Sequence, residues 1–168
     1  MKQTLYHIDG AESLQTPLGH MEIQTSKGKI VACYFISPNA DPAAAPNELT
    51  REGIRQLSGY FTGQRQIFDL PLFYEGTDFQ QRVFDELMKI PFGSTLSYKQ
   101  VAGRINLSSS GSRAIGNIIG RNPLLILIPC HRVVGYQGEI TGYAGGIERK
   151  RWLLQHEMET VIPPGRLF

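Results

Sequence analysis

The residues of this chain best suited to chemistry are a cysteine and the two polar residues that follow it. Cys130, His131 and Arg132 come directly after an apolar run at 124–127 and Pro129. A thiol reacts as its thiolate, so a base or cation nearby that promotes loss of the proton separates a nucleophile from a packing residue. Cys130 taken alone would favour a buried, inert thiol. Its polar neighbours favour a nucleophile.

Two further features flank this cysteine. Asn122-Pro123 precedes it, and Thr-Gly-Tyr-Ala-Gly-Gly follows at 141–146. The combined string of Asn-Pro, four apolar residues, Pro-Cys-His-Arg-Val and Gly-Tyr-Ala-Gly-Gly resembles the O6-alkylguanine-DNA alkyltransferases. These are suicide repair proteins that take an alkyl group off guanine. The resemblance is specific over residues 77–168 and loose over 1–70.

The resemblance implies a role for each polar residue of the string. Cys130 would attack the alkyl carbon, guanine would leave, and the stable thioether would limit the protein to one turnover. His131 would activate the thiol through a water, with Glu157 orienting the imidazole, as in other nucleophile-base-orienter sets. Asn122 would hold a helix and an active-site strand in register. Arg132 would tie that strand to nearby carbonyls or carboxylates.

A guanine that is stacked in a duplex must leave the stack before a protein can act on its O6 substituent. By resemblance, Tyr98 would crowd the target phosphate and donate a proton to the departing guanine. Arg113 would fill the vacated stack, although an ordinary phosphate contact is its alternative. Val133, Tyr143 and Ala144 would line the base pocket.

The segment before the cysteine predicts a helix-turn-helix, a geometry that also occurs in helical packing with no ligand. Ser97-Tyr98-Lys99-Gln100 has capping-box form and predicts a helix through Ile105, a small-residue turn covers 106–111, and a second helix is expected over 112–121. In the resembling family the second helix enters the minor groove, whose degenerate code suits a protein that must accept any flanking sequence. Small residues there would let the backbone approach DNA, unless they serve helix packing. The expected DNA contacts are Ser112, Arg113, Ala114, Gly116 and Arg121.

Two positions depart from the family pattern. Ala144 stands where some relatives have serine, which leaves open the range of alkyl lesions accepted. Gly120-Arg121 stands where some relatives have arginine and then glycine, which leaves the phosphate contact there undecided. Acceptance of O4-alkylthymine is also left open.

The remaining elements predict an α/β protein of two domains, 1–73 and 77–168, with a linker at about 70–76. Strands are expected at 18–24 and 30–35, joined by a turn at 26–29. A loop at 38–46 precedes a helix whose apolar face carries Leu49, Ile54, Leu57 and Phe61. By resemblance the first domain is a small ribonuclease-H-like α/β structural domain. The second is a mostly helical, winged-helix-like domain that starts at the capping box of Thr77 and Gln80 and carries DNA binding and alkyl transfer.

Composition narrows the setting. The chain has 168 residues, of which 41% are hydrophobic, enough for packed cores. We expect a cytoplasmic protein without membrane attachment, because no segment has the pattern of a signal peptide or a membrane span. Cys33 is expected to be a core thiol, and with His7 and His20 it falls short of a zinc ligand set, so no metal or cofactor is expected.

The distribution of charge weakly supports a nucleic-acid partner. Residues 1–76 hold six Lys and Arg against eight Asp and Glu, whereas residues 77–168 hold eleven against seven. The basic half therefore carries the reactive string, which favours a nucleic-acid partner. We expect a monomer in solution that binds double-stranded DNA carrying alkylated guanine; whether it binds DNA cooperatively is left open.

Two alternatives compete with alkyl transfer. A non-enzymatic, alkyltransferase-like protein would bind the lesion without repairing it, but such proteins carry another residue in place of Cys130. A Cys-His hydrolase would use the same thiol on acyl carbons, but it needs an oxyanion hole and turnover. Stoichiometry separates these readings.

Overall fold

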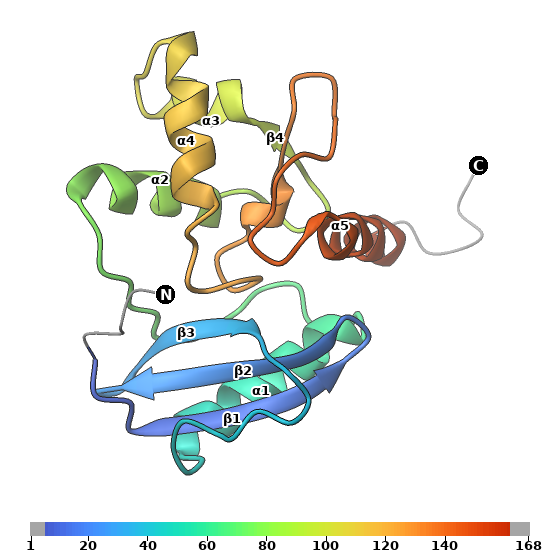
Figure 1. Ribbon diagram of the computed structural model, residues 1–168. Helices are drawn as coiled ribbons and strands as arrows, with labels where there is room; N and C mark the ends of the chain where they lie inside the picture. Colours follow the sequence, from blue (N-terminus) through green and yellow to red (C-terminus); the bar gives the residue numbers. More distant parts are fainter. Residues whose placement is uncertain (1–5, 162–168) are drawn as a thin grey trace. The chain divides into compact units, whose positions relative to one another are not determined.

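The computed structural model describes residues 6–161, and the chain divides into two compact units, Met1–Tyr74 and Glu75–Phe168. The first unit is a three-stranded antiparallel sheet in the order β1-β2-β3 with one helix, α1, against one face (Figure 1). The bounds are β1 Gly10–Thr16, β2 Gly19–Ser26, β3 Lys29–Phe35 and α1 Glu48–Phe61.

The predicted hairpin is confirmed. Strands β2 and β3 pair up to Ser26 opposite Lys29, and the two residues between them, Lys27 and Gly28, both have positive φ. Two-residue turns of this kind match the right-handed twist of the flanking strands. Cys33 is fully buried in β3, as expected of a core thiol, and burial raises its pKa.

The buried face of α1 differs from the predicted one. Leu57 is buried as expected, but Leu49, Ile54 and Phe61 are only half-buried. The helix instead turns Gly53 toward the sheet, where a side-chain Cβ would lie 2.8 Å from Cδ1 of Ile23. A glycine at this point lets the helix axis approach the sheet closely, so the packing face is centred on a small residue rather than on the largest apolar ones.

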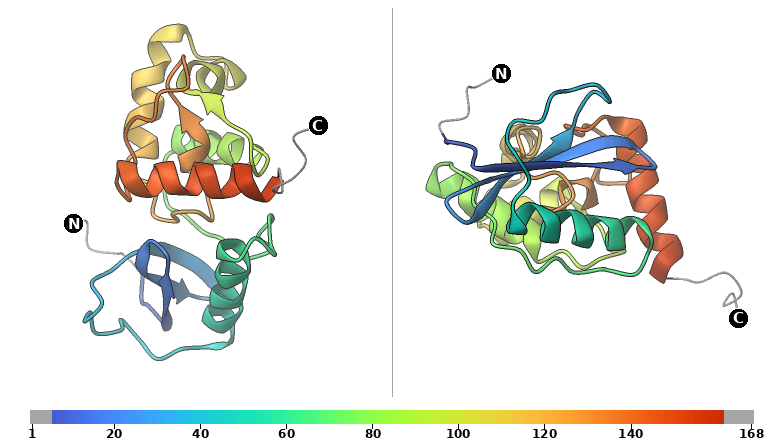
Figure 2. Two further views of the ribbon diagram at one scale, coloured as in Figure 1. Left: turned by 90° about the vertical axis from the view of Figure 1, so that its right-hand side faces the viewer. Right: turned by 90° about the horizontal axis from the view of Figure 1, so that it is seen from below.

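The second unit is mostly helical, with a parallel pair of two-residue strands, β4 and β5 (Figure 2). Together with the first unit it confirms the α/β class and the helical second half. Its elements are α2 Asp78–Met88, β4 Leu96–Ser97, α3 Tyr98–Arg104, η1 Ser109–Gly111, α4 Ser112–Ile119, η2 Cys130–Arg132, β5 Val133–Val134 and α5 Ile147–Val161.

Both predicted capping boxes in this unit are formed. The Thr77 and Ser97 side chains each accept a hydrogen bond from the backbone N–H of the glutamine three residues later, and that glutamine's side chain accepts one from the cap residue's own N–H. Two otherwise unpaired N–H groups are thereby satisfied at each helix start.

Helix α4 ends at Ile119 with Gly120 as its cap, so Arg121 lies beyond the helix and not in it as predicted. Pro123 disfavours helical backbone just before it.

The predicted active-site strand is wrong. Cys130 begins a short 3-10 turn, and the apolar run before it folds into a tight turn in which the N–H of Ile128 donates to the carbonyl of Leu124. Ile126 has a φ of 72°, which is rare for a β-branched residue. A continuous apolar run predicts a buried strand equally well by pattern alone, and this one is buried as a turn.

Within residues 6–161, no helix is both long and apolar enough to cross a membrane. In the same part of the chain, no group of three or more His, Cys, Asp or Glu side chains is placed to hold a metal ion.

Candidate active site

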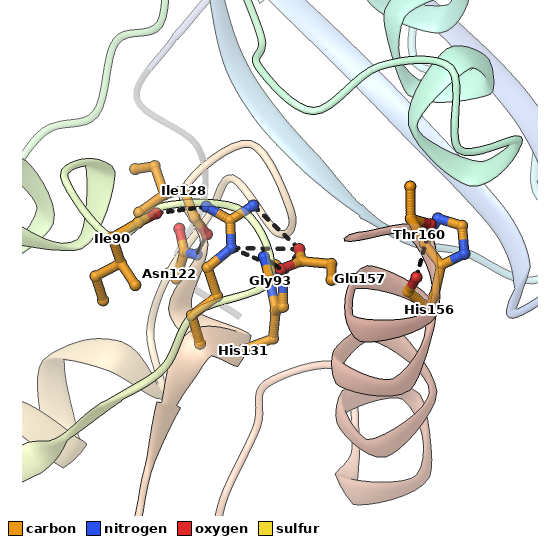
Figure 3. Close-up of polar contacts among 9 residues, drawn as sticks. Ile90, Gly93, Asn122, Ile128, His131, His156, Glu157 and Thr160 are labelled. Carbon is orange, nitrogen blue, oxygen red and sulfur yellow. Dashed lines mark hydrogen bonds and ion pairs between the residues drawn. The ribbon is translucent and has the colours of Figure 1, made fainter. Parts of the chain in front are cut away.

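The centre of the site is the carboxylate of Glu157, which lies on the inner face of α5 and is almost fully buried. Oε1 is 2.6 Å from Nε2 of His131 and accepts from the Arg132 guanidinium, while Oε2 accepts from Nε of Arg132 at 2.9 Å and from the N–H of Gly93 at 2.9 Å (Figure 3). Burial by itself raises the pKa of this carboxyl, but the hydrogen bonds from His131 and Arg132 and the positive charge of Arg132 bring the pKa below its ordinary value. Glu157 is therefore an anion inside the protein.

The anion fixes the state of His131. This imidazole is fully buried, and burial lowers its pKa, so the ring is neutral near pH 7. A neutral imidazole has one N–H, and the ionised carboxylate beside Nε2 can only accept, so that hydrogen is on Nε2. Nδ1 then carries the lone pair, and within residues 6–161 it makes no hydrogen bond. The ring thus offers a free basic nitrogen.

Cys130 is also fully buried, next to His131 in η2. Burial raises the pKa of its thiol to about 11, against the opposing influence of a hydrogen bond from Asn122 and the charge of Lys150. Nδ2 of Asn122 lies 3.1 Å from Sγ. The resting thiol is therefore protonated, and it can react at neutral pH only if a base removes the proton.

Asn122 connects the end of α4 to the cysteine turn. Its Nδ2 donates to the carbonyl of Ile128 at 3.0 Å, and its Oδ1 accepts from the N–H of Leu124 at 2.9 Å. Both ends of the strained turn that contains Ile126 are thus bound by one side chain. These hydrogen bonds join the end of α4 to a turn, where a strand was expected.

Arg132 has the predicted structural contacts. Besides the carboxylate of Glu157, its Nη1 donates to the carbonyl of Ile90 at 2.6 Å, and its guanidinium lies 5.7 Å from the ring centroid of Phe92. The buried guanidinium joins the end of α2 to η2 and α5.

Lys150 was missed by sequence reasoning. It is fully buried on α5, and its Nζ donates to the carbonyls of Val133, Thr141 and Gly142. Burial lowers its pKa to about 8. The one signal in the sequence is its spacing, because residues seven apart on a helix, here Lys150 and Glu157, lie on the same face. This lysine fixes the loop after β5 beside the cysteine.

The expected base-pocket residues lie around this loop. Val133 is fully buried, the ring of Tyr143 meets that of His131 edge-on at 6.5 Å, and Ala144 is exposed on the same loop. Tyr98, half-buried at the start of α3, has its ring centroid 5.8 Å from Nζ of Lys150, and its hydroxyl accepts from Thr141 at 3.4 Å. Lys150 thus connects Tyr98 to the loop beside Cys130.

The expected DNA contacts on α4 are spread along its accessible side. Arg113 is exposed, whereas Ser112, Ala114 and Gly116 are half-buried, and Arg121 is exposed beyond the helix end. A Cβ on Gly116 would touch only Cε1 of Tyr98, at an ordinary 3.8 Å. Tight helix packing therefore does not require glycine at 116.

Comparison with known families and proteins gives a consistent result. The family described as 6-O-methylguanine DNA methyltransferase, DNA binding domain, matches residues 78–159. A methylated-DNA–protein-cysteine methyltransferase of Mycobacterium tuberculosis is 49% identical over 153 residues, which cover 89% of each chain. One of Mycobacterium leprae is 34% identical over 160 residues, covering 93% of this chain and 96% of the relative.

Solved structures agree. The crystal structure of the M. tuberculosis O6-methylguanine methyltransferase superposes with a TM-score of 0.80 at 35% identity, over 94% of this chain and 96% of that one. The structure of M. tuberculosis OGT in complex with DNA gives 0.81 at 36% identity, over 90% and 94%.

The Glu157 cluster predicts a stability effect. Replacing the carboxylate in Glu157→Gln leaves the buried Arg132 without its counter-charge, and we expect the free energy of unfolding to fall by about 3–5 kcal/mol. Urea unfolding followed by circular dichroism measures it. Glu148→Gln, on the same helix but in an exposed pair with Arg151, is the matched control and should change little.

The same comparison has a pH dependence. A carboxyl whose pKa is lowered by folding stabilises the fold above its unfolded pKa, and this stability is lost as pH falls from about 4.5. His131 is buried in its neutral form, so the free energy of unfolding also decreases as the pH falls below the ordinary histidine pKa of 6.5. Unfolding energies for Glu157→Gln and the parent that run parallel below pH 4.5 would contradict the assignment.

Proposed function

The chain belongs to the family of methylated-DNA–protein-cysteine methyltransferases, and on that premise we propose that it repairs DNA by moving the alkyl group of O6-alkylguanine onto its own Cys130. The observation that carries the proposal is the buried set of Cys130, His131 and Glu157, in which a protonated thiol sits beside an imidazole with a basic nitrogen. DNA is the partner of the family's matched domain. We take a monomer to be the acting unit.

The reaction follows from the protonation states. Nδ1 of His131, through a water, takes the thiol proton, and Glu157 stabilises the imidazolium that results. The sulfur lone pair then forms the S–C bond to the alkyl carbon as the C–O6 bond breaks. The electrons of that bond remain on guanine, which takes up a proton, and the hydroxyl of Tyr98 is the proposed donor. The thioether product has no route back to a thiol, so one protein molecule repairs one lesion.

The electrostatic surroundings favour the displacement. Charge develops first on sulfur and then on guanine O6, and the site holds Lys150 and the N–H groups of η2 close to the sulfur. Preorganised donors in a site shielded from water stabilise such charge without having to reorient. Lys150 also keeps the carbonyls of 133, 141 and 142 pointing inward, which positions the loop that we propose to contact the flipped base.

Access of DNA is proposed to follow α4. Arg113 is exposed near its start, where it can enter the space that the extruded guanine leaves. Gly116 leaves open surface on the accessible side of the helix, where the minor groove would lie. A lesion-binding protein without transfer activity would need none of the buried proton relay, so the intact relay favours repair over binding alone.

Single-turnover transfer is tested by intact mass. After incubation with duplex DNA containing O6-methylguanine, the protein should gain one methyl group per molecule, located by peptide mapping on Cys130. Cys130→Ala should gain nothing and should still bind the lesion; Cys33→Ala is the matched control and should gain the methyl. Retained transfer in Cys130→Ala, or continued demethylation beyond one lesion per molecule, would refute the mechanism.

The proton relay predicts a pH profile. In the parent, transfer should rise with pH only until His131 is neutral, below its ordinary pKa of 6.5, and then level off. His131→Gln should be slower near pH 7 by about 10²–10⁴-fold. Its rate should climb about tenfold per pH unit toward the thiol pKa of about 11. Rapid-quench rates from pH 6 to 9 measure this effect, with His156→Gln, on α5 beside Glu157, as the control. A level pH profile in His131→Gln would count against His131 as the base.

The approach of α4 to DNA predicts a third effect. Gly116→Ala adds a methyl where the duplex should come closest, and affinity for DNA should fall about fivefold, corresponding to ~1 kcal/mol. Gly103→Ala is the matched helical control, because its Cβ would meet no atom within 4 Å. Both changes should slightly stabilise the helices they lie in. Fluorescence anisotropy with labelled duplex measures affinity; equal losses in both variants would refute the contact.

A further inference from the structure

A groove borders the proposed site on the side of α4. Its cavity has a volume of about 470 Å³ and is lined from α3 by Tyr98 and Lys99, from α4 by Arg113, Gly116 and Asn117, and from the turn after β5 by Tyr136. A second cavity, of about 560 Å³, is lined by Lys99 and Tyr136 together with Ser97 and Gln100. The pair formed by Lys99 and Tyr136 is therefore common to two hollows of this surface.

Tyr136 is held out of the protein on a closed turn. Tyr136 is 79% exposed, although large aromatic side chains usually bury most of their surface. The N–H of Gly135 donates to the carbonyl of Glu139, the N–H of Gly138 donates to the carbonyl of Gly135, and the Glu139 carboxylate accepts from the N–H of Gln137. The ring therefore extends from a turn whose backbone is fixed by several hydrogen bonds.

The groove is positively charged. Nζ of Lys99 lies 5.6 Å from the ring centroid of Tyr136, and Arg113 lines the same cavity. Neither cation has an ion-pair partner among residues 6–161. The acidic side chain of this turn, Glu139, is engaged by the backbone of the turn itself. A cationic groove with an exposed aromatic ring is the arrangement by which proteins hold single-stranded nucleic acid, through phosphate contacts and base stacking.

The groove shares residues with the proposed DNA surface, which indicates that DNA is the molecule that occupies it. Tyr98, Arg113 and Gly116 belong to both surfaces. When a guanine leaves the helix, the nucleotides on its two sides in the same strand each lose a stacking partner; Arg113 is proposed to enter the space between them, and an exposed ring can stack on one of these bases. We propose that this groove binds the nucleotide next to the extruded guanine on the damaged strand, with Tyr136 stacking on its base and Lys99 contacting its phosphate.

This inference rests on the proposed function and has its own consequence. Because the stacking partner comes from the protein, the contact needs no complementary strand. The chain should therefore bind O6-methylguanine in single-stranded DNA through the same groove, and the loss of the ring should be felt more strongly there than in a duplex, where base stacking on the other side persists.

The test measures equilibrium binding to single-stranded and duplex DNA that contain O6-methylguanine next to 2-aminopurine. The full chain is used, and it carries Cys130→Ala to prevent reaction. Tyr136→Ser should weaken single-strand binding by about 5–150-fold and Tyr136→Phe should restore it, since a stacked base contributes ~1–3 kcal/mol. Quenching of 2-aminopurine fluorescence on binding should disappear in Tyr136→Ser. Lys99→Gln should reduce the salt dependence by about 0.7 of a unit of log–log slope for a single strand.

Lys29→Gln, which removes an exposed lysine from the first unit, is the matched control and should change neither affinity nor salt slope. Unchanged affinity and unchanged quenching in Tyr136→Ser would overturn the proposal, as would a loss that Tyr136→Phe does not restore. Failure of the proposed function itself has a separate signature, because the parent protein would then gain no methyl group from lesion DNA.

Discussion

The buried carboxylate of Glu157 is the interaction on which the second unit depends. A carboxylate in a protein interior is costly unless cations and hydrogen-bond donors surround it, and here a guanidinium, an imidazole and a backbone N–H do so. The N–H comes from Gly93, whose φ of 74° and whose contact with α5, where a Cβ would lie 2.6 Å from Val161, both require glycine. One charge thus binds α5, η2 and the turn after α2 together, and the same charge sets the tautomer of His131. Fold and reactivity cannot be altered separately at this point.

A second constraint acts on the turn before Cys130. Ile126 adopts a backbone conformation that disfavours β-branched side chains, and it does so fully inside the core. Such strain persists only where surrounding contacts outweigh it. Asn122 supplies them, because it bonds the backbone at both ends of the turn and reaches Sγ as well. The sulfur is therefore placed by the geometry of a turn, and any change at the sulfur is felt by the side chain that maintains that turn.

Features of the structure that arise from neighbouring residues could be predicted from the sequence. The capping boxes at Thr77 and Ser97 and the hairpin at Lys27-Gly28 need only residues within four positions, and all are present. The reactive string was found because its members are close in sequence. Pairing of Glu157 with Arg132 spans 25 positions, and that of Glu157 with Gly93 spans 64. The role of Lys150 as donor to three carbonyls, the packing of α1 through Gly53 and the turn in place of a strand all depend on tertiary contacts, which periodicity does not encode.

The complete burial of Cys130 has a consequence for the lifetime of the unused protein. A reagent that works once must survive until its substrate arrives, and its competitors are the oxidants and small electrophiles of its surroundings, which attack exposed thiolates first. Cys130 is shielded from solvent and protonated at rest, and Cys33 is equally enclosed. The unused protein should therefore lose its reactive thiol slowly. Its supply should be consumed by damaged bases that fit its site rather than by the oxidants and electrophiles around it.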